Sequence, residues 1–184
     1  MHTMVITAKI WYHQIMINTT DNPRVRAIRH RVRTAYDKLL ELINGPLATM
    51  DASKLYQAPE AGAWTIMENI AHVIEFLPYW GDEIARLAAA PGQNFGRTME
   101  HAGRLRAVNE HGTDTLKQAT AALPASYNHL EGILQSLHDA DLDLEGRHTR
   151  FGVRSLDWFI DEFVTTHLEN HLQQIQACIS ALAR

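Results

Sequence analysis

The sequence predicts an all-α protein, a four-helix bundle with long crossover connections. Apolar residues recur at three- and four-residue steps over four separate stretches, which is typical of amphipathic helices. Alternating, strand-like patterns are weak throughout the chain. The three connections, at roughly 45–64, 91–112 and 139–154, are longer than the usual link between neighbouring helices. The 184 residues are enough for one domain with its own core.

The first helix is predicted from Pro23 to Asn44. Asn22 is a good N-cap residue, and proline is favoured at the first helical position. Gly45 and Pro46 are expected to end the helix. Its apolar stripe consists of Val25, Ile28, Val32, Ala35, Leu39, Leu42 and Ile43.

The second helix is predicted to begin after Thr65. Thr65 with Glu68 three residues later forms a capping box, in which each side chain accepts a hydrogen bond from a backbone N–H at the helix start. The helix should reach about Ala90, where a Pro-Gly pair follows. Pro78 lies inside it and is expected to kink it, because proline removes one backbone hydrogen bond.

The third helix is predicted from about Thr113 to His138, with Pro124 either kinking or splitting it. The fourth should start at Ser155, a suitable N-cap residue, and run to about Ala183. Apolar residues cover a broad face of this last helix. Residues 23–184 are therefore expected to form one bundle domain.

Residues 1–22 are expected to be an N-terminal extension, such as a short extended arm. This segment has no small-residue cleavage pattern, so it is not expected to be a signal peptide. A start at Met16 would make the preceding residues an untranslated leader, and the sequence leaves this alternative open.

Composition excludes several classes of function. The formal net charge is −4, with acidic and basic residues interspersed, so no basic surface for nucleic acid is expected. No apolar run approaches the ~18 residues needed to cross a membrane. Cys178 is the only cysteine, so the fold does not depend on an internal disulfide. A cytoplasmic location is expected.

Histidine is the unusual component, with 11 residues. His167 and His171 are four residues apart on the fourth predicted helix, so both rings lie on one face and could share a metal ion. With so many histidines, such a pair also arises by chance, and a metal site and a core pair both remain open. Leu168 stands where a zincin protease needs its general base, which disfavours that class. Glu145 and His148 offer only one of the two Glu-x-x-His motifs that a di-iron bundle requires.

A third histidine, His72 on the second helix, makes the pattern more specific. The sequence resembles the DinB-like superfamily, also called the DinB/YfiT-like metalloenzymes, over about residues 24 to 183. The motifs that carry this resemblance are Trp64-Thr65-x-x-Glu68-x-x-x-His72, the approach Gly152-Val153-Arg154-Ser155, and His167-x-x-x-His171-x-x-Gln174-Ile175.

The resemblance implies a bundle with long crossovers, frequent homodimers, and a divalent metal ion on His72, His167 and His171. Glu68 and Gln174 fall on motif positions without an assigned role. No catalytic residue is assigned, and Glu68 is a candidate to orient His72 from outside the ligand set. Zn, Ni, Fe and Mn all accept imidazole ligands, so the metal is not identified.

Three neutral imidazoles leave coordination positions open, which is typical of catalytic metal sites. Such a metal can lower the pKa of a bound water or hold a thiol as its thiolate. Some members of the family are similar to thiol S-transferases that use a low-molecular-weight thiol in stress or detoxification. We therefore expect a metal-dependent enzyme with a small-molecule substrate. A non-catalytic metal- or ligand-binding bundle, or a dimerisation module, is the alternative.

The remaining polar residues are assigned to ordinary roles. Cys178 is expected to be a small buried apolar residue rather than a ligand. Glu75 is expected to be solvated, although it could orient His72. The histidines in or near the connections are expected to be mostly exposed, namely His101, His111, His129, His138 and His148. Arg147 and Arg150 are expected to lie on a solvated loop.

Overall fold

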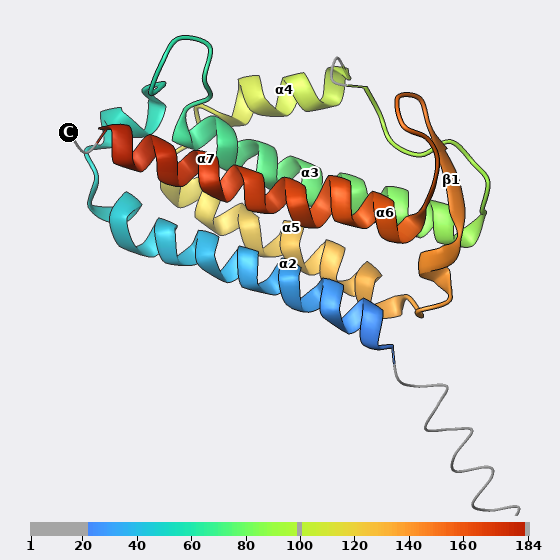
Figure 1. Ribbon diagram of the computed structural model, residues 1–184. Helices are drawn as coiled ribbons and strands as arrows, with labels where there is room; N and C mark the ends of the chain where they lie inside the picture. The colour runs from blue at the N-terminus through green and yellow to red at the C-terminus, as the bar shows by residue number, and fades with distance from the viewer. Residues whose placement is uncertain (1–21, 99–100, 183–184) are drawn as a thin grey trace, which may run out of the picture.

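The computed structural model describes residues 22–98 and 101–182 (Figure 1). Four long helical segments run along one another, as predicted. They are α2 (Pro23–Leu42), α3 (Ile66–Ala89), α5 (Leu116–Ser136), and a last segment built from α6 (Leu156–Ile160) and α7 (Thr166–Leu182). The predicted extension at residues 1–22 lies outside the described part of the chain, apart from its last residue. None of the described helices is both long and apolar enough to span a bilayer.

The long connections contain structure that the sequence did not predict. Helix α4 (Ala102–His111) lies on the outer side of α3, within the second connection (Figure 1). Strands β1 (Glu145–His148) and β2 (Gly152–Ser155) form an antiparallel hairpin in the third connection. Short 3-10 turns occupy Ala52–Tyr56 and Asp141–Asp143. Four-residue strands are too short for an alternating pattern to be recognised in the sequence.

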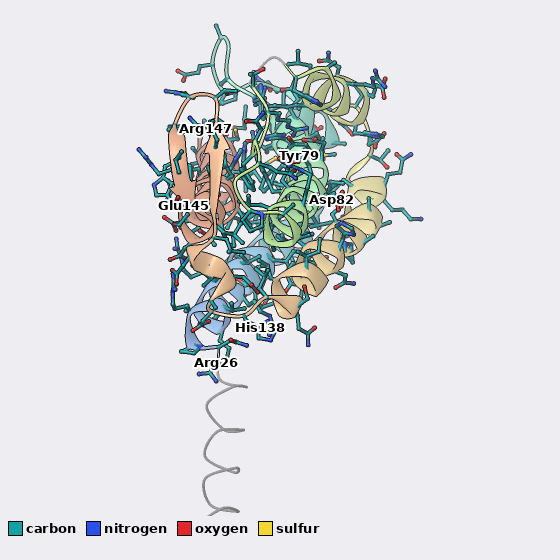
Figure 2. All side chains as sticks on the ribbon, turned by 90° about the vertical axis from the view of Figure 1, so that its right-hand side faces the viewer. Arg26, Tyr79, Asp82, His138, Glu145 and Arg147 are labelled. Atoms are coloured by element: carbon teal, nitrogen blue, oxygen red, sulfur yellow. The ribbon has the colours of Figure 1, made fainter. Side chains whose placement is uncertain are left out.

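The hairpin closes one end of the bundle. Gly146 of β1 lies so close to the core that a Cβ atom there would be 2.9 Å from both methyl carbons of Leu87 and 3.2 Å from the ring of Phe159. The backbone of Arg147 exchanges two hydrogen bonds with the crossover after α3, at Gln93 and Phe95. Figure 2 views the molecule from this end, with Glu145 and Arg147 labelled on the hairpin.

Pro78 and Pro124 lie inside the continuous helices α3 and α5. Of the two alternatives for Pro124, a kink or a split of the third helix, the split is therefore wrong. The predicted end of the first helix at Gly45-Pro46 is also wrong, because the chain continues through a π-helical turn, η1 (Ile43–Leu47). A π turn leaves one backbone carbonyl spare, which accommodates the missing N–H of Pro46.

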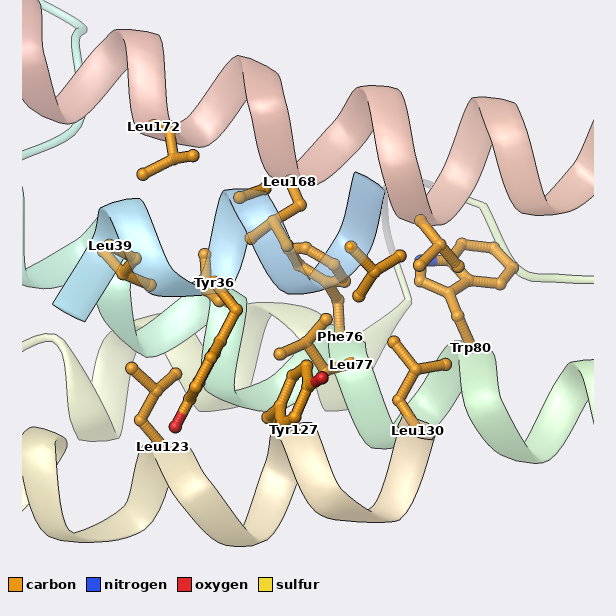
Figure 3. Packing of buried hydrophobic residues seen from close by; sticks show 14 of the residues in the cluster. Tyr36, Leu39, Phe76, Leu77, Trp80, Leu123, Tyr127, Leu130, Leu168 and Leu172 are labelled. Atoms are coloured by element: carbon orange, nitrogen blue, oxygen red, sulfur yellow. The ribbon is translucent and has the colours of Figure 1, made fainter. Parts of the chain in front are cut away.

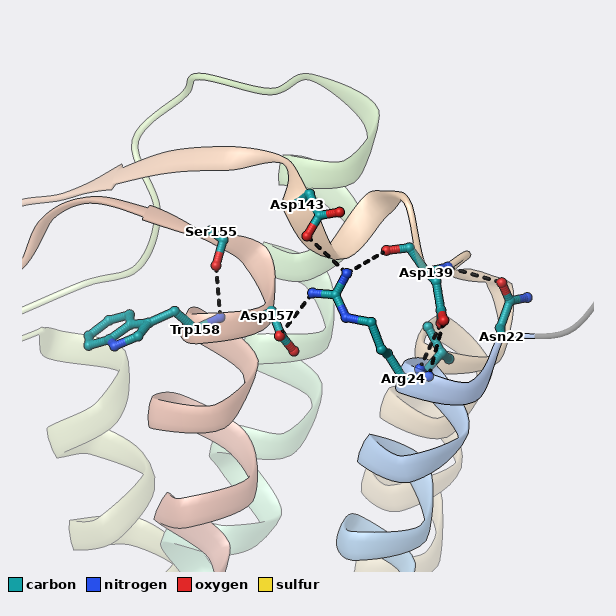
Figure 4. Close-up of polar contacts among 8 residues, drawn as sticks. Asn22, Arg24, Asp139, Asp143, Ser155, Asp157 and Trp158 are labelled. Carbon is teal, nitrogen blue, oxygen red and sulfur yellow. Dashed lines mark hydrogen bonds and ion pairs between the residues drawn. The ribbon is translucent and has the colours of Figure 1, made fainter.

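The start of α2 is capped differently from the prediction. Asn22 occupies the N-cap position but makes no side-chain cap, and its Oδ1 accepts from the N–H of Asp139 instead. The carboxylate of Asp139 accepts from the N–H groups of Arg24 and Val25, at 3.1 and 3.0 Å (Figure 4). Arg24 also donates to Asp143 and Asp157, so this cap ties α2 to the two later segments.

The capping boxes explain where the other helices begin. Thr65 Oγ1 accepts from the N–H of Glu68 while Glu68 Oε2 accepts from the N–H of Thr65, as predicted. A second capping box, Thr115 with Gln118, starts α5 three residues after the predicted start. Ser155 caps α6, also as predicted.

The core lies between the four long segments (Figure 3). Tyr36 of α2 and Tyr127 of α5 stack with ring centroids 4.1 Å apart. Leucines from α3, α5 and α7 are fully buried around them, including Leu77, Leu130 and Leu168. Complete removal of these side chains from water is the main stabilising contribution to the bundle.

The last helical segment is not a regular α-helix. A π-helical turn, η4 (Asp161–Thr165), joins α6 to α7. The hydroxyl of Thr165 donates to the carbonyl of Asp161 at 3.0 Å within this turn. The segment therefore contains one residue more per turn immediately before His167 and His171, and such turns often occur at functional sites.

Candidate metal centre

The structure brings His72, His167 and His171 together. One ring nitrogen from each lies within 4.8 Å of the other two, and this group could hold a metal ion. His72 comes from α3 and the other two from α7. Asn69 bonds to His171 and Phe76 stacks on His167, so α3 and α7 run antiparallel here.

The two histidines of α7 face each other. Their Nε2 atoms are 2.9 Å apart, and their rings are nearly parallel at 24°. The i, i+4 spacing on one helix face places both rings side by side, as the sequence predicts. His171 is buried, whereas His167 is partly exposed.

Asn69 determines which nitrogen of His171 carries a proton. The Asn69 amide nitrogen donates to the carbonyl of Thr65 at 2.8 Å, which leaves Oδ1 facing His171. Oδ1 lies 2.8 Å from Nδ1 of His171 and can only accept, so Nδ1 carries the proton. Nε2 of His171 then carries the lone pair, which faces Nε2 of His167 and is the atom that could bind a cation. Asn69 is 1% exposed, and the sequence analysis did not assign it a role.

Glu75 plays the corresponding part for His72. Oε2 of Glu75 lies 3.4 Å from Nδ1 of His72, close enough for electrostatic attraction but without the alignment of a hydrogen bond. Arg97 donates to both carboxylate oxygens of Glu75, at 2.5 Å to Oε1 and 2.6 Å to Oε2. The predicted solvation of Glu75 is therefore wrong, because the crossover after α3 brings Arg97 over it.

The pKa of Glu75 reflects this environment. Burial raises it, but the contacts with His72 and Arg97 outweigh burial and bring the pKa down to about 2. The carboxylate therefore stays charged at neutral pH. A carboxylate beside Nδ1 favours the proton on that nitrogen and leaves Nε2 of His72 as the ligand atom.

The buried nitrogens of His72 show that the site suits a cation. His72 is 1% exposed, and neither ring nitrogen has a hydrogen-bond partner within the described residues. A buried polar atom without a partner costs about 1–3 kcal/mol. A divalent cation on Nε2 would remove this cost, and imidazole is a preferred ligand of such metals.

All three imidazoles are neutral at physiological pH. Burial lowers the pKa of His167 to about 3 and that of His171 to about 2, with further lowering by the other histidines and by Arg104. Burial also lowers the pKa of His72. Only the neutral imidazole binds metal, so the low pKa values keep the group ready to do so.

Aromatic rings surround the three histidines. Trp64 stacks on His171 at 5.8 Å and meets His72 edge-on at 5.2 Å. Phe76 stacks on His167 at 4.5 Å. These rings exclude water from two sides and strengthen electrostatic interactions within the group.

The other candidate residues lie elsewhere or have structural roles. Glu68 makes the capping box at the start of α3 and is not one of the three residues of the cluster. Gln174 is exposed. Cys178 is buried, as predicted, and its thiol contacts the carbonyl of Trp64 at 3.5 Å.

His148 is the one connection histidine that does not match expectation. His101, His111, His129 and His138 are exposed, as predicted, but His148 is only 5% exposed. Its ring packs against Phe151 and Phe163, with centroid distances of 5.1 Å to each. The unpredicted hairpin explains the difference, because β1 directs this ring into the bundle.

The sequence contained a usable signal for Asn69 but not for Arg97. Asn69 is a polar residue three positions before His72, on the same apolar helix face, where a polar side chain needs a buried partner. Arg97 lies in the connection after α3, and Arg104 lies in α4, a helix that was not predicted. No periodic pattern in the sequence indicates that these segments pack near the start of α3.

A four-helix bundle with three converging imidazoles belongs to the class of proteins that can hold a metal ion between helices. The sequence matches the family model of the DinB superfamily over residues 30–175, and the chain belongs to this superfamily. No curated protein matches the sequence.

Solved structures share the fold at low sequence identity. YfiT from Bacillus subtilis, described as a probable metal-dependent hydrolase with an unusual four-helix bundle topology, is 13% identical with a TM-score of 0.70, covering 86% of this chain and 87% of that chain. An uncharacterised protein from Clostridium difficile 630 is 12% identical with a TM-score of 0.59, covering 83% and 94%. A mycothiol-dependent maleylpyruvate isomerase is 12% identical with a TM-score of 0.56, covering 86% and 60%.

Proposed function

We propose that this protein is a metal-dependent enzyme in which Nε2 of His72, His167 and His171 binds one divalent cation. The observation that carries the proposal is the convergence of three neutral imidazoles, one of which is the buried ring of His72, whose nitrogens have no hydrogen-bond partner in the described part of the chain. Asn69 and Glu75 orient two of the rings by holding the opposite ring nitrogen.

A bound cation would supply a Lewis acid that lowers the pKa of a water or a thiol. The residues of the chain bind and orient this ion, and Trp64 and Phe76 limit the access of water. Because His167 is partly exposed, a small molecule could approach the cluster from the side of this residue. Three histidines without a further protein ligand in the described cluster fit a catalytic site better than a closed structural one.

The proposed reaction is S-transfer involving a low-molecular-weight thiol. The similarity in fold to a mycothiol-dependent isomerase supports a thiol as co-substrate, and the similarity to a probable hydrolase supports water as the alternative. A neutral imidazole set suits the thiol, because it leaves the cation's charge available to stabilise a thiolate.

Elemental analysis of the purified protein tests the metal site. We expect one equivalent of a divalent metal, chosen from Zn, Ni, Fe and Mn, and loss of most of it in His167→Ala. His30→Ala is the matched control, because His30 is exposed and lies outside the cluster. Full metal content in His167→Ala would contradict the proposal.

Turnover assays distinguish an enzyme from a binding module. The protein is incubated with a thiol and an electrophilic acceptor, and separately with hydrolysable esters and amides. We expect metal-dependent consumption of the thiol that His167→Ala abolishes. A protein that holds its metal but consumes neither class of substrate would be a metal-binding module.

Residues 23–184 are proposed to form the functional unit, with residues 1–22 as an extension of it. A homodimer is likewise a proposal and follows from membership of the family, whereas the proposed cytoplasmic location follows from the features of the sequence. Light scattering on the full chain and on residues 23–184, each with its metal content measured, would test the assembly and the boundary.

A further inference from the structure

The π-helical turn η4 lies immediately before two of the three imidazoles in the last helical segment. The N–H of Thr166 donates to the carbonyl of Asp161, five residues earlier, whereas an α-helix spans four residues with each bond. Turns of this kind are rare, and they need local contacts to hold them against a regular α-helix. Side chains from within the turn and from α2 make such contacts.

Thr165 is the buried contact within the turn. Its side chain is 1% exposed, and its Oγ1 lies 3.0 Å from both the carbonyl oxygen and Oδ1 of Asp161. The same carbonyl would accept the backbone N–H of Thr165 in an α-helix, so the hydroxyl competes with that α-helical bond. The Thr165 side chain therefore favours the π-helical arrangement and links the end of the turn to its beginning.

Arg31 of α2 contacts the last helical segment at the start of the turn and beyond it. Its Nη1 donates to Oδ1 of Asp161 at 2.6 Å, and its Nη2 donates to Oε2 of Glu169 at 3.1 Å. Asp161 is the first residue of η4, and Glu169 belongs to α7. One guanidinium therefore connects the start of the turn to the helix that carries the histidines.

We propose that Thr165 and Arg31 are positioning residues of the metal centre, which hold the π turn and, through it, the rings of His167 and His171. This inference rests on the proposed function. Glu169 is two residues from either histidine, about 200° away around the helix, so Arg31 acts on the far side of α7 from the rings. A turn held in this way reduces the ordering that metal binding requires.

Metal affinity and stability are measured separately on the same variants to test this assignment. The full chain is freed of metal, and Co²⁺ is added in competition with a chromophoric chelator, which gives its dissociation constant. The visible absorption of the bound Co²⁺ reports the geometry of its ligands. Urea unfolding in the presence of a chelator gives the stability of the metal-free protein.

We expect Thr165→Val, which keeps the size of the side chain and loses the hydroxyl, to weaken Co²⁺ binding about tenfold and to change the Co²⁺ spectrum. Thr165→Ser keeps the hydroxyl and should restore most of the affinity. Arg31→Gln should weaken binding less, about threefold, because its ion pairs with Asp161 and Glu169 are partly exposed. Arg31 lies at the surface, so this variant is informative even if Thr165→Val does not fold.

Two arginines of α2 supply matched controls for Arg31→Gln. Arg33 bonds to Asp37 of its own helix, and Arg29 bonds to Glu131 of α5. Arg33→Gln and Arg29→Gln remove the same charge from α2, but neither ion pair includes a residue of the last helical segment. Both variants should bind Co²⁺ as the wild type does, even where their stability falls.

The outcomes separate this inference from the proposed function. If Thr165→Val and Arg31→Gln bind Co²⁺ as tightly as the wild type, the positioning role is overturned and the proposed function stands. Equal losses of affinity in Arg31→Gln and Arg29→Gln would also overturn it, because the effect would then come from charge or stability. A wild-type protein that binds no Co²⁺ overturns both.

Discussion

Asn69 is a single residue on which the metal affinity should depend. Replacement by alanine removes the acceptor that holds Nδ1 of His171, so Nε2 loses its fixed lone pair. We expect Asn69→Ala to weaken metal binding about 10–100-fold, the usual effect of removing a residue that orients a ligand. Competition with a chromophoric chelator measures the dissociation constant.

Asn69→Asp is the matched control for this prediction. Aspartate keeps an acceptor for His171 but loses the donor to the carbonyl of Thr65. Metal affinity should therefore fall less than in Asn69→Ala. Equal affinities in the wild type and Asn69→Ala would show that His171 is oriented by other contacts.

The ion pair of Glu75 and Arg97 gives a second prediction at the residue scale. The two side chains are 17% and 6% exposed, so removal of Arg97 leaves a buried carboxylate without its partner. We expect Arg97→Met to lower the free energy of unfolding by about 3 kcal/mol. The pKa of Glu75 should rise from about 2 in this variant. Denaturant unfolding at pH 7 measures the loss.

The double variant Glu75→Gln with Arg97→Met separates lost charge from lost packing. It removes both charges, so it should be more stable than Arg97→Met alone. A double variant as unstable as the sum of the two single variants would show that the two residues act independently.

At the scale of elements, helices that carry their own start signals could be predicted from the sequence. The capping box at Thr65 and the N-cap at Ser155 placed two helix starts correctly. Helix α4 has a weak apolar stripe and was missed. The hairpin was missed because its strands are short. The helix end predicted at Gly45-Pro46 was wrong because a π turn tolerates proline.

The hairpin's fit to the core gives a prediction for two glycines. Gly146→Ala places a methyl group against Leu87 and Phe159, so we expect a loss of about 1–3 kcal/mol in unfolding free energy. Gly132→Ala is the contrasting change, since Gly132 lies in α5 with nothing within 4 Å. It should stabilise the protein by about 0.4–1 kcal/mol. Thermal unfolding of both variants measures the two effects.

The two variants are expected to change the free energy of unfolding in opposite directions. If Gly146→Ala is neutral, the hairpin must be able to move away from the bundle without cost. A destabilising Gly132→Ala would show that alanine at this position makes an unfavourable contact.

At the scale of the whole molecule, stability should depend on pH through the histidine cluster. The pKa values of His167 and His171 are lowered from 6.5 to about 3 and about 2 in the folded state. Below pH 6.5 the unfolded chain binds more protons than the folded one, so the free energy of unfolding falls as pH falls. Each such histidine contributes up to about 1.4 kcal/mol per pH unit. Denaturant unfolding in a chelator between pH 7 and 5 measures this slope.

His167→Phe serves as the control for the pH dependence. It removes one titrating group and keeps an aromatic ring beside Phe76, so the slope should decrease by the contribution of one histidine. A wild-type stability that does not change between pH 7 and 5 would contradict the low pKa values.

The meeting of three imidazoles was expected from the resemblance to the DinB-like superfamily, whereas the residues around them were not expected. The spacing of His167 and His171 alone left a metal site and a core pair open, and His72 was added by the resemblance. Arg97 lies in the crossover after α3 and Arg104 lies in α4. Neither segment has a clear periodic pattern, so their packing against α3 could not be predicted from the sequence. The same reason explains why His148 was expected at the surface.

The π turn at Asp161–Thr165 has a consequence for the orientation of the last helix. Each residue of an α-helix advances the side chains by about 100° around its axis. Deletion of one residue there, with α6 held in place, would rotate α7 so that Leu168 and Leu172 occupy the directions of His167 and His171. One residue of helix length, rather than any change in composition, decides whether this helix presents leucines or imidazoles to α3.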